Sequence, residues 1–469
     1  MAKQRVEFRC DECGASAPQW AGKCASCGAW NTLQEGAALV ATPGPVAMAL
    51  HQPAVPVCEI DMAEWAARST GVAELDRVLA GGLVPGSVTL LGGEPGVGKS
   101  TLLTQVAAAM AHAGGRVLYV TAEESSQQVR LRAERLDALA PRLLLAAETN
   151  LPTILGHFDA VRPDVAIVDS IQSVHDPELG SAPGSVVQVR ECAHRLVREA
   201  KERGVAVVLV GHVTKDGSLA GPRVLEHVVD TVLSFEGEHH HALRLVRAVK
   251  HRFGSTNEVG LFEMGEHGLI PVPDASALFL ADRRPGVAGS AVVPALDGHR
   301  PLLVEVQALT LDTNAPMARR SAQGLDAGRL AFLLAVLERH AGLPIVKQDV
   351  FALAVGGARV VEPGADLAIA LAVASSLANV ALADDFVACA ELGLGGELRQ
   401  VSQTPRRLAE AARLGFRRVL LPHSAPEPPR GLTPVRAATI GEAITLAGLD
   451  SSTARPAARP RPTAAAPPT

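Results

Sequence analysis

The chain has 469 residues, 48% of them hydrophobic, which is enough for two or three globular domains. Aromatic residues make up only 3%, so the core is expected to be aliphatic and of α/β type. A net charge of −5 excludes a wholly basic protein that coats nucleic acid, but it leaves open a local basic groove. The amino terminus lacks an apolar core of signal-peptide length, so we expect a cytoplasmic protein whose seven cysteines are reduced.

Two Cys-x-x-Cys pairs lie near the amino terminus, Cys10 with Cys13 and Cys24 with Cys27. Four thiolates at this spacing fit a tetrahedral Zn²⁺ ion, whereas four unrelated thiols and an iron–sulfur cluster are the alternatives. A head this small cannot bury enough surface to fold alone, so the metal would supply folding free energy. Because four ligands close the site, it is expected to be structural. The isolated cysteines are expected to be inert: Cys58, Cys192 and Cys389.

Composition divides the chain into six parts. After the zinc finger, residues 1–35, comes a nearly uncharged linker, 36–57. Residues 58–270 alternate short β-branched runs with helical patterns, which is typical of a mostly parallel sheet covered by helices on both faces. The remaining parts are a connector at 271–285, a second α/β domain at 286–450 and a tail at 451–469 that is expected to be disordered. Strands are predicted in the first α/β domain at 87–91, 116–121, 165–169 and 205–211.

A phosphate-binding loop follows the first of these strands. Residues 93–100, GEPGVGKS, satisfy the pattern G-x-x-x-x-G-K-[ST] and lead into a helical stretch. Backbone N–H groups of such a loop face the phosphates of ATP, Lys99 reaches the β and γ oxygens, and Ser100 ligates Mg²⁺. The predicted nucleotide contacts are Gly93, Glu94, Pro95, Gly96, Val97, Gly98, Lys99, Ser100 and Thr101.

Polar side chains follow three other predicted strands. Asp169 would emerge beside the loop and hold Mg²⁺ from the metal side, with a plain helix N-cap as the alternative. Glu123 and Glu124 follow the strand at 116–121, and we expect Glu123 to activate the attacking water; a solvated acidic turn is the alternative. His212 could sense the γ-phosphate, although a lone histidine is more often structural.

The sequence AVKHRFG places two cations, Lys250 and Arg252, around His251 after an apolar run. Phe253 is expected to pack as an anchor and Gly254 to allow a turn. This stretch lies far along the chain from the phosphate loop. A strand-end charge pair bound to solvent is the alternative to a role in catalysis.

Together these segments resemble the RadA (Sms) family of bacterial recombination and repair ATPases, whose core is RecA-like. The resemblance runs from Cys10 to about Leu446. It rests on the four-cysteine head and on GGEPGVGKSTLL, YVTAEES, IVDSIQ, GHVTKDGSLAGPRVLEHVVDTVLSFEG, AVKHRFG and RPLLVEVQALT. It implies an α/β fold with a four-cysteine zinc finger, a RecA-type P-loop ATPase core and a domain similar to the Lon protease domain, assembled as a homo-hexamer.

The resemblance also implies an activity: ATP-driven movement on single-stranded and branched DNA, promoting branch migration and strand-exchange extension alongside the recombinase RecA. Lys99, Ser100, Asp169 and Glu123 match the family's phosphate, Mg²⁺ and water-activating positions. Lys215 and Arg223 lie where RecA-like proteins carry a mobile DNA-contacting loop, and an ordinary solvated loop is the alternative.

AVKHRFG matches a family signature that usually reads Lys-Asn-Arg-Phe-Gly, so His251 replaces an asparagine whose hydrogen bond the imidazole must make or lose. In ring ATPases a cation from one subunit often completes the site of its neighbour. Lys250 and Arg252 are therefore predicted to be catalytic in the neighbouring subunit.

Proteolysis is not expected from the Lon-like domain. Asp366 stands at the position of the nucleophile and Pro405 at that of the lysine, and neither supplies the required hydroxyl or amine. We expect a ring-forming scaffold, whose DNA-facing basic surface could include Arg399, Arg406, Arg407, Arg413, Arg417 and Arg418, with solvated helix faces as the alternative. The alanine-rich run 367–383 is expected to be a buried helix rather than a membrane span.

Two other functions stay open: a KaiC-like regulatory ATPase or kinase, because its paired acids resemble TAEES, and a scaffold that uses ATP only to assemble. The four-cysteine head, the Lon-like domain and KHRFG favour the DNA motor.

Overall fold

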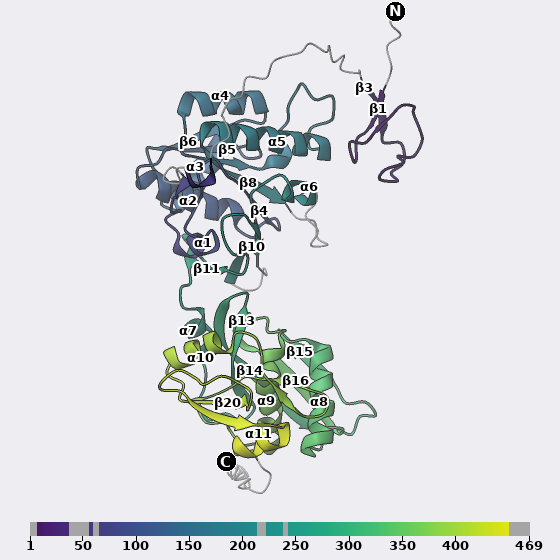
Figure 1. Ribbon diagram of the computed structural model, residues 1–469, viewed down its shortest axis with the longest axis vertical. Coiled ribbons are helices and arrows are strands. Elements are labelled where there is room, and N and C mark those ends of the chain that lie inside the picture. The colour runs from purple at the N-terminus through teal and green to yellow at the C-terminus, as the bar shows by residue number, and fades with distance from the viewer. Residues whose placement is uncertain (1–6, 37–55, 60–64, 213–221, 238–242, 450–469) are drawn as a thin grey trace, which may run out of the picture. The chain divides into compact units, whose positions relative to one another are not determined.

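The computed structural model describes residues 7–36, 56–59, 65–212, 222–237 and 243–449. The chain separates into two compact units, Met1–Pro273 and Asp274–Thr469. Figure 1 shows both units with their helices and strands.

The cysteine-rich head is a small antiparallel sheet with the strand order β2-β1-β3. The strands are β1 Glu7–Cys10, β2 Ser16–Ala17 and β3 Leu33–Gly36. Its buried residues are Cys10, Cys24 and Leu33, while Trp20 and Trp30 lie exposed. With so small a core, this head must rely on something other than apolar burial for its stability.

The rest of the first unit is built on a nine-stranded sheet with the order β12-β11-β10-β9-β4-β8-β7-β5-β6. The six strands from β9 to β6 pair in parallel, and β10, β11 and β12 extend the sheet antiparallel. Their bounds are β4 Val88–Gly93, β5 Val117–Thr121, β6 Leu143–Ala147, β7 Val165–Asp169, β8 Ala206–His212, β9 Thr231–Glu236, β10 Leu243–His251, β11 Val259–Gly265 and β12 Gly268–Pro271.

Helices cover both faces of this sheet, as its continuously apolar strands require. Helices α1 and α2 pack on one face in an aliphatic cluster, and α4 and α5 pack on the other. The helices are α1 Ala73–Val78, α2 Lys99–His112, α3 Ser126–Arg135, α4 Leu151–Val161, α5 Val186–Arg203 and α6 Pro222–Glu226, with short 3₁₀ turns at η1 Val57–Glu59 and η3 Ile171–Ser173.

The second unit has a seven-stranded mixed sheet with the order β15-β16-β14-β13-β17-β20-β21 and a separate β18–β19 pair. The strands are β13 Ser290–Asp297, β14 Arg300–Asp312, β15 Arg320–Gln323, β16 Gln348–Ala354, β17 Phe386–Ala388, β18 Glu391–Leu392, β19 Leu398–Arg399, β20 Arg418–Pro422 and β21 Thr433–Ala437. The helices are α7 Ala275–Leu280, α8 Ala327–Ala341, α9 Asp366–Ala378, α10 Thr404–Arg413 and α11 Ile440–Leu446, with 3₁₀ turns η4 Val355–Gly357 and η5 Pro363–Ala365.

The fold class predicted from the sequence is confirmed: a cysteine-rich head, an α/β core with a mostly parallel sheet, and a second α/β domain. Helix α9 is buried along nearly its whole length. The predicted connector contains helix α7, and AVKHRFG begins inside β10, which also includes the apolar run before it. Among the described residues, no helix combines the length and the apolar character needed to cross a membrane.

Candidate nucleotide site and metal centre

The phosphate loop lies between the end of β4 at Gly93 and the start of α2 at Lys99. Gly98 has φ +112°, and a Cβ there would lie 2.9 Å from the Met264 Cε atom. Only glycine combines this backbone conformation with so close a neighbour. The loop therefore turns sharply enough to place backbone N–H groups at the amino end of α2, where anions bind.

Lys99 is buried at the base of this loop. Its Nζ donates hydrogen bonds to the carbonyl oxygens of Gly93 (2.8 Å) and Glu94 (3.0 Å). Burial lowers the pKa of Lys99, while the nearby charges of Asp169 and Glu123 act in the opposite direction. An ammonium group held in this way can exchange its carbonyl partners for phosphate oxygens.

Asp169 ends strand β7 and reaches the first turn of α2. The Oδ2 atom of its carboxylate accepts hydrogen bonds from the Ser100 hydroxyl (2.6 Å) and the Tyr119 hydroxyl (2.7 Å). The N-cap of the turn that follows is Ser170, so Asp169 is not a helix N-cap. A serine hydroxyl and a carboxylate this close are a suitable pair to hold Mg²⁺ directly and through water.

The two neighbouring glutamates point to different partners. Glu123 accepts hydrogen bonds from the hydroxyls of Ser170, the residue after Asp169, and Ser173. Glu124 instead forms an ion pair with Arg132 of α3 (2.6 Å). The structure therefore brings Glu123 to the side of Asp169 and engages Glu124 elsewhere.

Three other predicted contact residues of the first domain, His212, Lys215 and Arg223, lie next to or within stretches that the structure does not describe. The backbone of His212 pairs with Gly93 in the sheet, so this position borders the loop, but its side chain lies outside the described part. Lys215 and the side chain of Arg223 also lie outside it.

The cations of AVKHRFG lie at the opposite end of β4 from the loop. The backbone N–H of Arg252 donates to the carbonyl oxygen of Asp230 (3.2 Å). The N–H of Asp230 in turn donates to the carbonyl oxygen of Val88, the first residue of β4 (3.0 Å). The six residues of β4 span about 16 Å. Neither cation can therefore reach the loop of its own chain.

Lys250 and Arg252 differ in how they are held. The Nζ of Lys250 donates to the carbonyl oxygens of Glu226 (2.6 Å) and Val229 (2.8 Å), so it would have to leave both to contact a phosphate. Arg252 pairs with buried Asp230 at 3.2 Å and keeps 52% of its side chain exposed. Arg252 is thus the more available cation.

The middle of the signature is closely packed. The Nδ1 atom of His251 shares a hydrogen bond with the Thr231 hydroxyl (2.9 Å), so the imidazole has a polar partner at this position. Its ring packs edge-on against Phe253 with centroids 6.0 Å apart. A Cβ on Gly254 would lie 2.5 Å from the Ala80 Cβ, so a side chain cannot be accommodated there.

Two residues near the loop, Tyr119 and Arg244, were not predicted from the sequence to belong to the site. Tyr119 donates its hydroxyl to Asp169, and Arg244 of β10 donates from its Nε to the Val97 carbonyl oxygen inside the loop (3.2 Å). Both contacts depend on which strands lie side by side. A register prediction for the sheet, and not a motif, would have been needed to find them.

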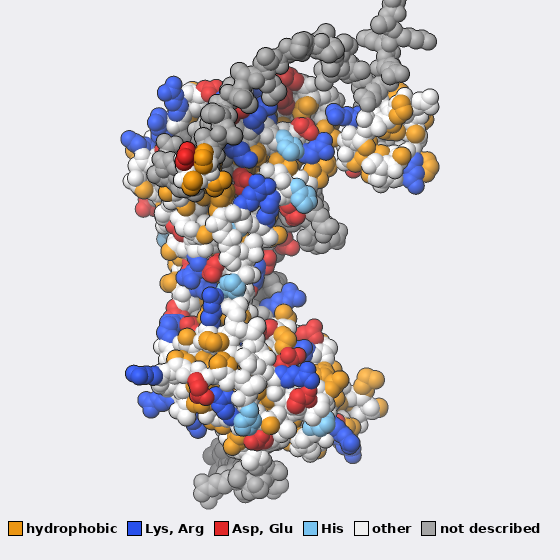
Figure 2. Space-filling view, in the orientation of Figure 1, with side chains coloured by type: hydrophobic (Ala, Val, Ile, Leu, Met, Phe, Trp, Pro, Cys, Tyr) orange, Lys and Arg blue, Asp and Glu red, His pale blue; other side chains and the backbone are white. Residues whose placement is uncertain are grey.

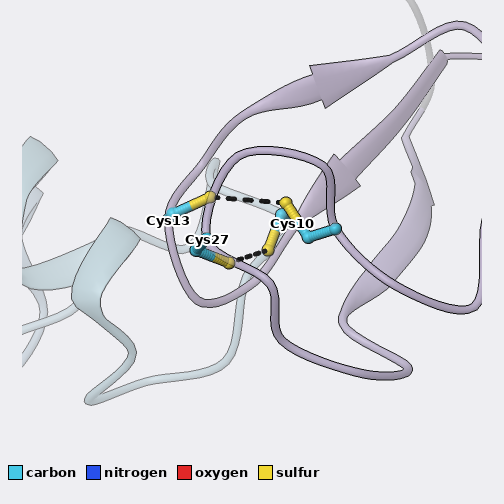
Figure 3. A group of neighbouring side chains, drawn as sticks. Cys10, Cys13 and Cys27 are labelled. Atoms are coloured by element: carbon cyan, nitrogen blue, oxygen red, sulfur yellow. Dashed lines mark hydrogen bonds between the residues drawn. The ribbon is translucent and has the colours of Figure 1, made fainter.

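The four cysteines of the head converge. Their sulfur atoms lie within 4.8 Å of one another, with Cys10 and Cys27 at 3.6 Å and Cys13 and Cys24 at 3.7 Å (Figure 3). Tetrahedral Zn²⁺ with Zn–S bonds of about 2.3 Å requires sulfur–sulfur separations of about 3.8 Å. The four thiols therefore fit a closed zinc site.

The remaining cysteines do not join this cluster. Burial raises the pKa of Cys192 and that of Cys389 to about 12, so neither thiol forms a thiolate near neutral pH. Cys58 is exposed.

In the second unit, Asp366 begins α9 and is fully buried. Its carboxylate accepts two hydrogen bonds from the Arg329 guanidinium (2.5 Å each) and one from the Leu392 N–H (3.0 Å). Pro405 lies in the first turn of α10. An ion pair thus occupies the position where the resemblance places a nucleophile.

The basic surface predicted for this unit is wrong for Arg407, which is buried against Glu362 and the Pro294 carbonyl oxygen. Its charge is used to satisfy interior acceptors. Three of the other arginines form ion pairs with carboxylates: Arg399 with Glu397, Arg413 with Asp274 and Glu410, and Arg418 with Asp385. Figure 2 shows basic and acidic side chains interspersed over this unit.

Three family models match parts of the chain. One described as an AAA domain matches residues 56–218, one described as a rubredoxin metal binding domain matches 8–35, and one described as subunit ChlI of Mg-chelatase matches 347–425. A solved structure, the KaiC-like protein PH0186 of Pyrococcus horikoshii, is 22% identical, with a TM-score of 0.37 over 44% of this chain and 99% of that one.

Curated relatives match over almost the whole length. The DNA repair protein RadA of Pseudomonas aeruginosa is 49% identical over 95% of this chain and 99% of its own. That of Halalkalibacterium halodurans is 46% identical over 90% of this chain and 93% of its own. The chain belongs to the RadA family. The resemblance drawn from its motifs is thereby confirmed, and the AAA domain match covers both the phosphate loop and Asp169.

Proposed function

We propose that this chain couples ATP hydrolysis to movement on single-stranded and branched DNA during recombinational repair, extending strand exchange. The proposed ATPase activity is supported by the contact of Ser100 with Asp169 beside buried Lys99. The DNA part is supported by the relatives, which are DNA repair proteins. The working form would be a cytoplasmic homo-hexamer that acts alongside RecA, with Lys215 and Arg223 contacting DNA phosphates.

Each residue of the nucleotide site has a distinct part in the proposed reaction. Lys99 would neutralise β- and γ-phosphate oxygens, and Ser100 and Asp169 would hold Mg²⁺. Bound Mg²⁺ would withdraw charge from the phosphates. Glu123, held by Ser170 and Ser173 next to Asp169, would orient the attacking water and accept its proton.

The site would be completed by a neighbouring subunit. Arg252 lies about 16 Å along β4 from its own loop and is half exposed, so only another chain's phosphates are within its possible reach. A guanidinium delivered in this way stabilises the charge that grows on the transferred phosphoryl group. Lys250, held by two carbonyl oxygens, would fix the strand end that presents Arg252.

The second unit is proposed to be a scaffold without peptidase activity. Asp366 is a buried partner of Arg329 and has no hydroxyl to form an acyl intermediate. Pro405 has no amine to act as the base.

The decisive experiment measures ATP hydrolysis by the full chain with and without single-stranded DNA at several salt concentrations. We expect stimulation by DNA and binding that weakens steeply as salt rises, because phosphate contacts release counterions. ATP hydrolysis without any DNA response would favour the KaiC-like regulatory ATPase. Nucleotide-dependent assembly without hydrolysis would favour the scaffold.

A further inference from the structure

The only tyrosine in the chain lies under the nucleotide site. Tyr119 sits in the middle of β5, and its side chain is 2% exposed within the aliphatic cluster that joins the sheet to α2. Its hydroxyl donates to the Oδ2 atom of Asp169 across 2.7 Å. A phenol buried among aliphatic side chains needs such a partner, and here the partner is the carboxylate assigned to the magnesium side.

The register of the sheet makes this contact possible. Strands β5 and β7 are paired so that Tyr119 lies opposite Ile167 and Thr121 lies opposite Asp169. Side chains two residues apart on a strand share one face, so Tyr119 and Asp169 occupy diagonal positions on the same face. Only a long side chain can bridge that diagonal, and the Tyr119 ring is buried in the cluster that the sheet shares with α2.

The two oxygen atoms of the Asp169 carboxylate differ in their hydrogen-bond partners. Both hydroxyl donors, Ser100 and Tyr119, bond to Oδ2, and among the described residues none bonds to Oδ1. Two donors fill the two lone pairs of Oδ2. They therefore fix the plane of the carboxylate and leave Oδ1 to accept from a ligand.

We propose that Tyr119 is a positioning residue that holds Asp169 in the orientation that receives hydrated Mg²⁺. The proposal rests on the nucleotide site of the proposed function. The Ser100 hydroxyl provides a single hydrogen bond, and the second one, from Tyr119, is needed to fix the plane of the carboxylate. Partners that orient a metal ligand through a second hydrogen bond typically change metal affinity or activity by about 10–100-fold when removed.

The first test is Tyr119→Phe in the full chain, which keeps the ring and removes only the hydroxyl. Binding of a fluorescent ADP analogue in the presence of EDTA should match the wild type. The Mg²⁺ concentration that gives half of the metal-dependent gain in ADP binding should rise by about 10-fold. Ile167→Val is the matched control, since it thins the same layer of the core beside Tyr119 and should leave the Mg²⁺ dependence unchanged. A wild-type Mg²⁺ dependence in Tyr119→Phe would overturn the proposal.

A second test needs no mutation. Because Tyr119 is the single tyrosine, growth with 3-fluorotyrosine places one fluorine nucleus in each chain, beside the hydroxyl in question. Its ¹⁹F resonance should shift when Mg²⁺ is added to the ADP-bound protein, and much less when ADP is added with EDTA. An unchanged resonance on adding Mg²⁺ would refute the proposal even if Tyr119→Phe failed to fold. Neither test uses DNA, so failure of DNA stimulation would count against the motor alone.

Discussion

Ser100 donates its hydroxyl hydrogen to Asp169 across 2.6 Å, although the two residues are 69 positions apart in the chain. Ser100 lies in α2, which follows β4, and Asp169 ends β7; these two strands are not neighbours, because β8 lies between them. The contact arises because parallel strands all end at one edge of the sheet, where the first turn of α2 also begins.

Replacement of Glu123 by Gln should abolish turnover and spare nucleotide binding. Gln keeps the size of the side chain and its hydrogen bonding to Ser170 but cannot accept a proton, so the hydrolysis rate should fall by about 10²-fold or more. Steady-state hydrolysis and ADP binding measure the two effects. Glu124→Gln is the control, since Glu124 pairs with Arg132, and it should keep most of the activity. Full activity in Glu123→Gln would remove this residue from the mechanism.

Arg252→Ala should keep the fold and ATP binding but lower hydrolysis by at least about 10³-fold, as expected for an arginine that acts on a neighbour. Arg247→Ala, which removes a cation from β10, the strand that ends just before Arg252, is the control and should stay active. Mixing Arg252→Ala chains with Lys99→Ala chains should restore part of the hydrolysis. In the mixture, an intact loop of the first variant meets an intact Arg252 of the second. Normal assembly without any recovery would disprove the role in the neighbour's site.

Removal of metal should unfold the head alone. A strong chelator should release about one Zn²⁺ per chain, because four thiolates form a single closed site. The far-ultraviolet circular dichroism of the two α/β units should stay nearly unchanged. Acidification should ease the release, since protons compete with the metal for the thiolates. Iron in the released metal would contradict the assignment.

Asp366→Ser would place a hydroxyl at the position of the lost nucleophile, yet we expect no gain of peptidase activity. The change leaves Arg329 without its carboxylate, and stability should fall by about 2–3 kcal/mol, less than for a fully buried pair because Arg329 is 29% exposed. Urea denaturation measures the loss. Glu397→Gln, which disrupts an exposed pair with Arg399, should cause little change. An equal loss of stability from both substitutions would mean that the buried pair contributes no more than the exposed pair.

The ion pair of Asp274 with Arg413 should make the second unit sensitive to acid. The two hydrogen bonds from Arg413 lower the pKa of Asp274 below its usual value of about 3.9. The stabilisation is therefore complete above that value and is lost as the pH falls through the lower pKa of the folded state. Asp274→Asn removes the charge but can keep the cap on α7, so its urea midpoint should lie below that of the wild type at neutral pH. This difference should shrink as the pH falls below about 4. A deficit that is independent of pH would contradict the ionic origin.

The parts of the site that sequence could predict are those contained in one continuous stretch. The loop pattern, the run that ends at Asp169 and the two Cys-x-x-Cys pairs each depend on neighbours along the chain, and the structure brings their members together. Contacts set by the order of strands could not be predicted. Tyr119 reaches Asp169 only because β5 and β7 are adjacent, and Arg244 reaches Val97 only because β10 extends the sheet.

Charge was the least predictable feature. The sequence shows Arg407 in a run of basic residues, but the fold buries it against Glu362, a partner 45 positions away. Lys250 and Arg252 are equivalent in the motif, yet carbonyl oxygens hold the first and leave the second half exposed. Whether a cation is buried, paired or exposed depends on the hydrogen-bond acceptors that tertiary packing brings close to it.

The aliphatic interior also determines which optical methods can follow this protein. All three tryptophans lie outside the packed cores: Trp20 and Trp30 in the head are 59% and 71% exposed, and Trp65 is 45% exposed. Indole emission already reports a largely aqueous environment in the folded chain, so melting of either sheet should change it very little. A flat fluorescence trace during heating would be a poor sign of heat resistance in this protein, whereas calorimetry or hydrogen exchange would record the loss of its cores directly.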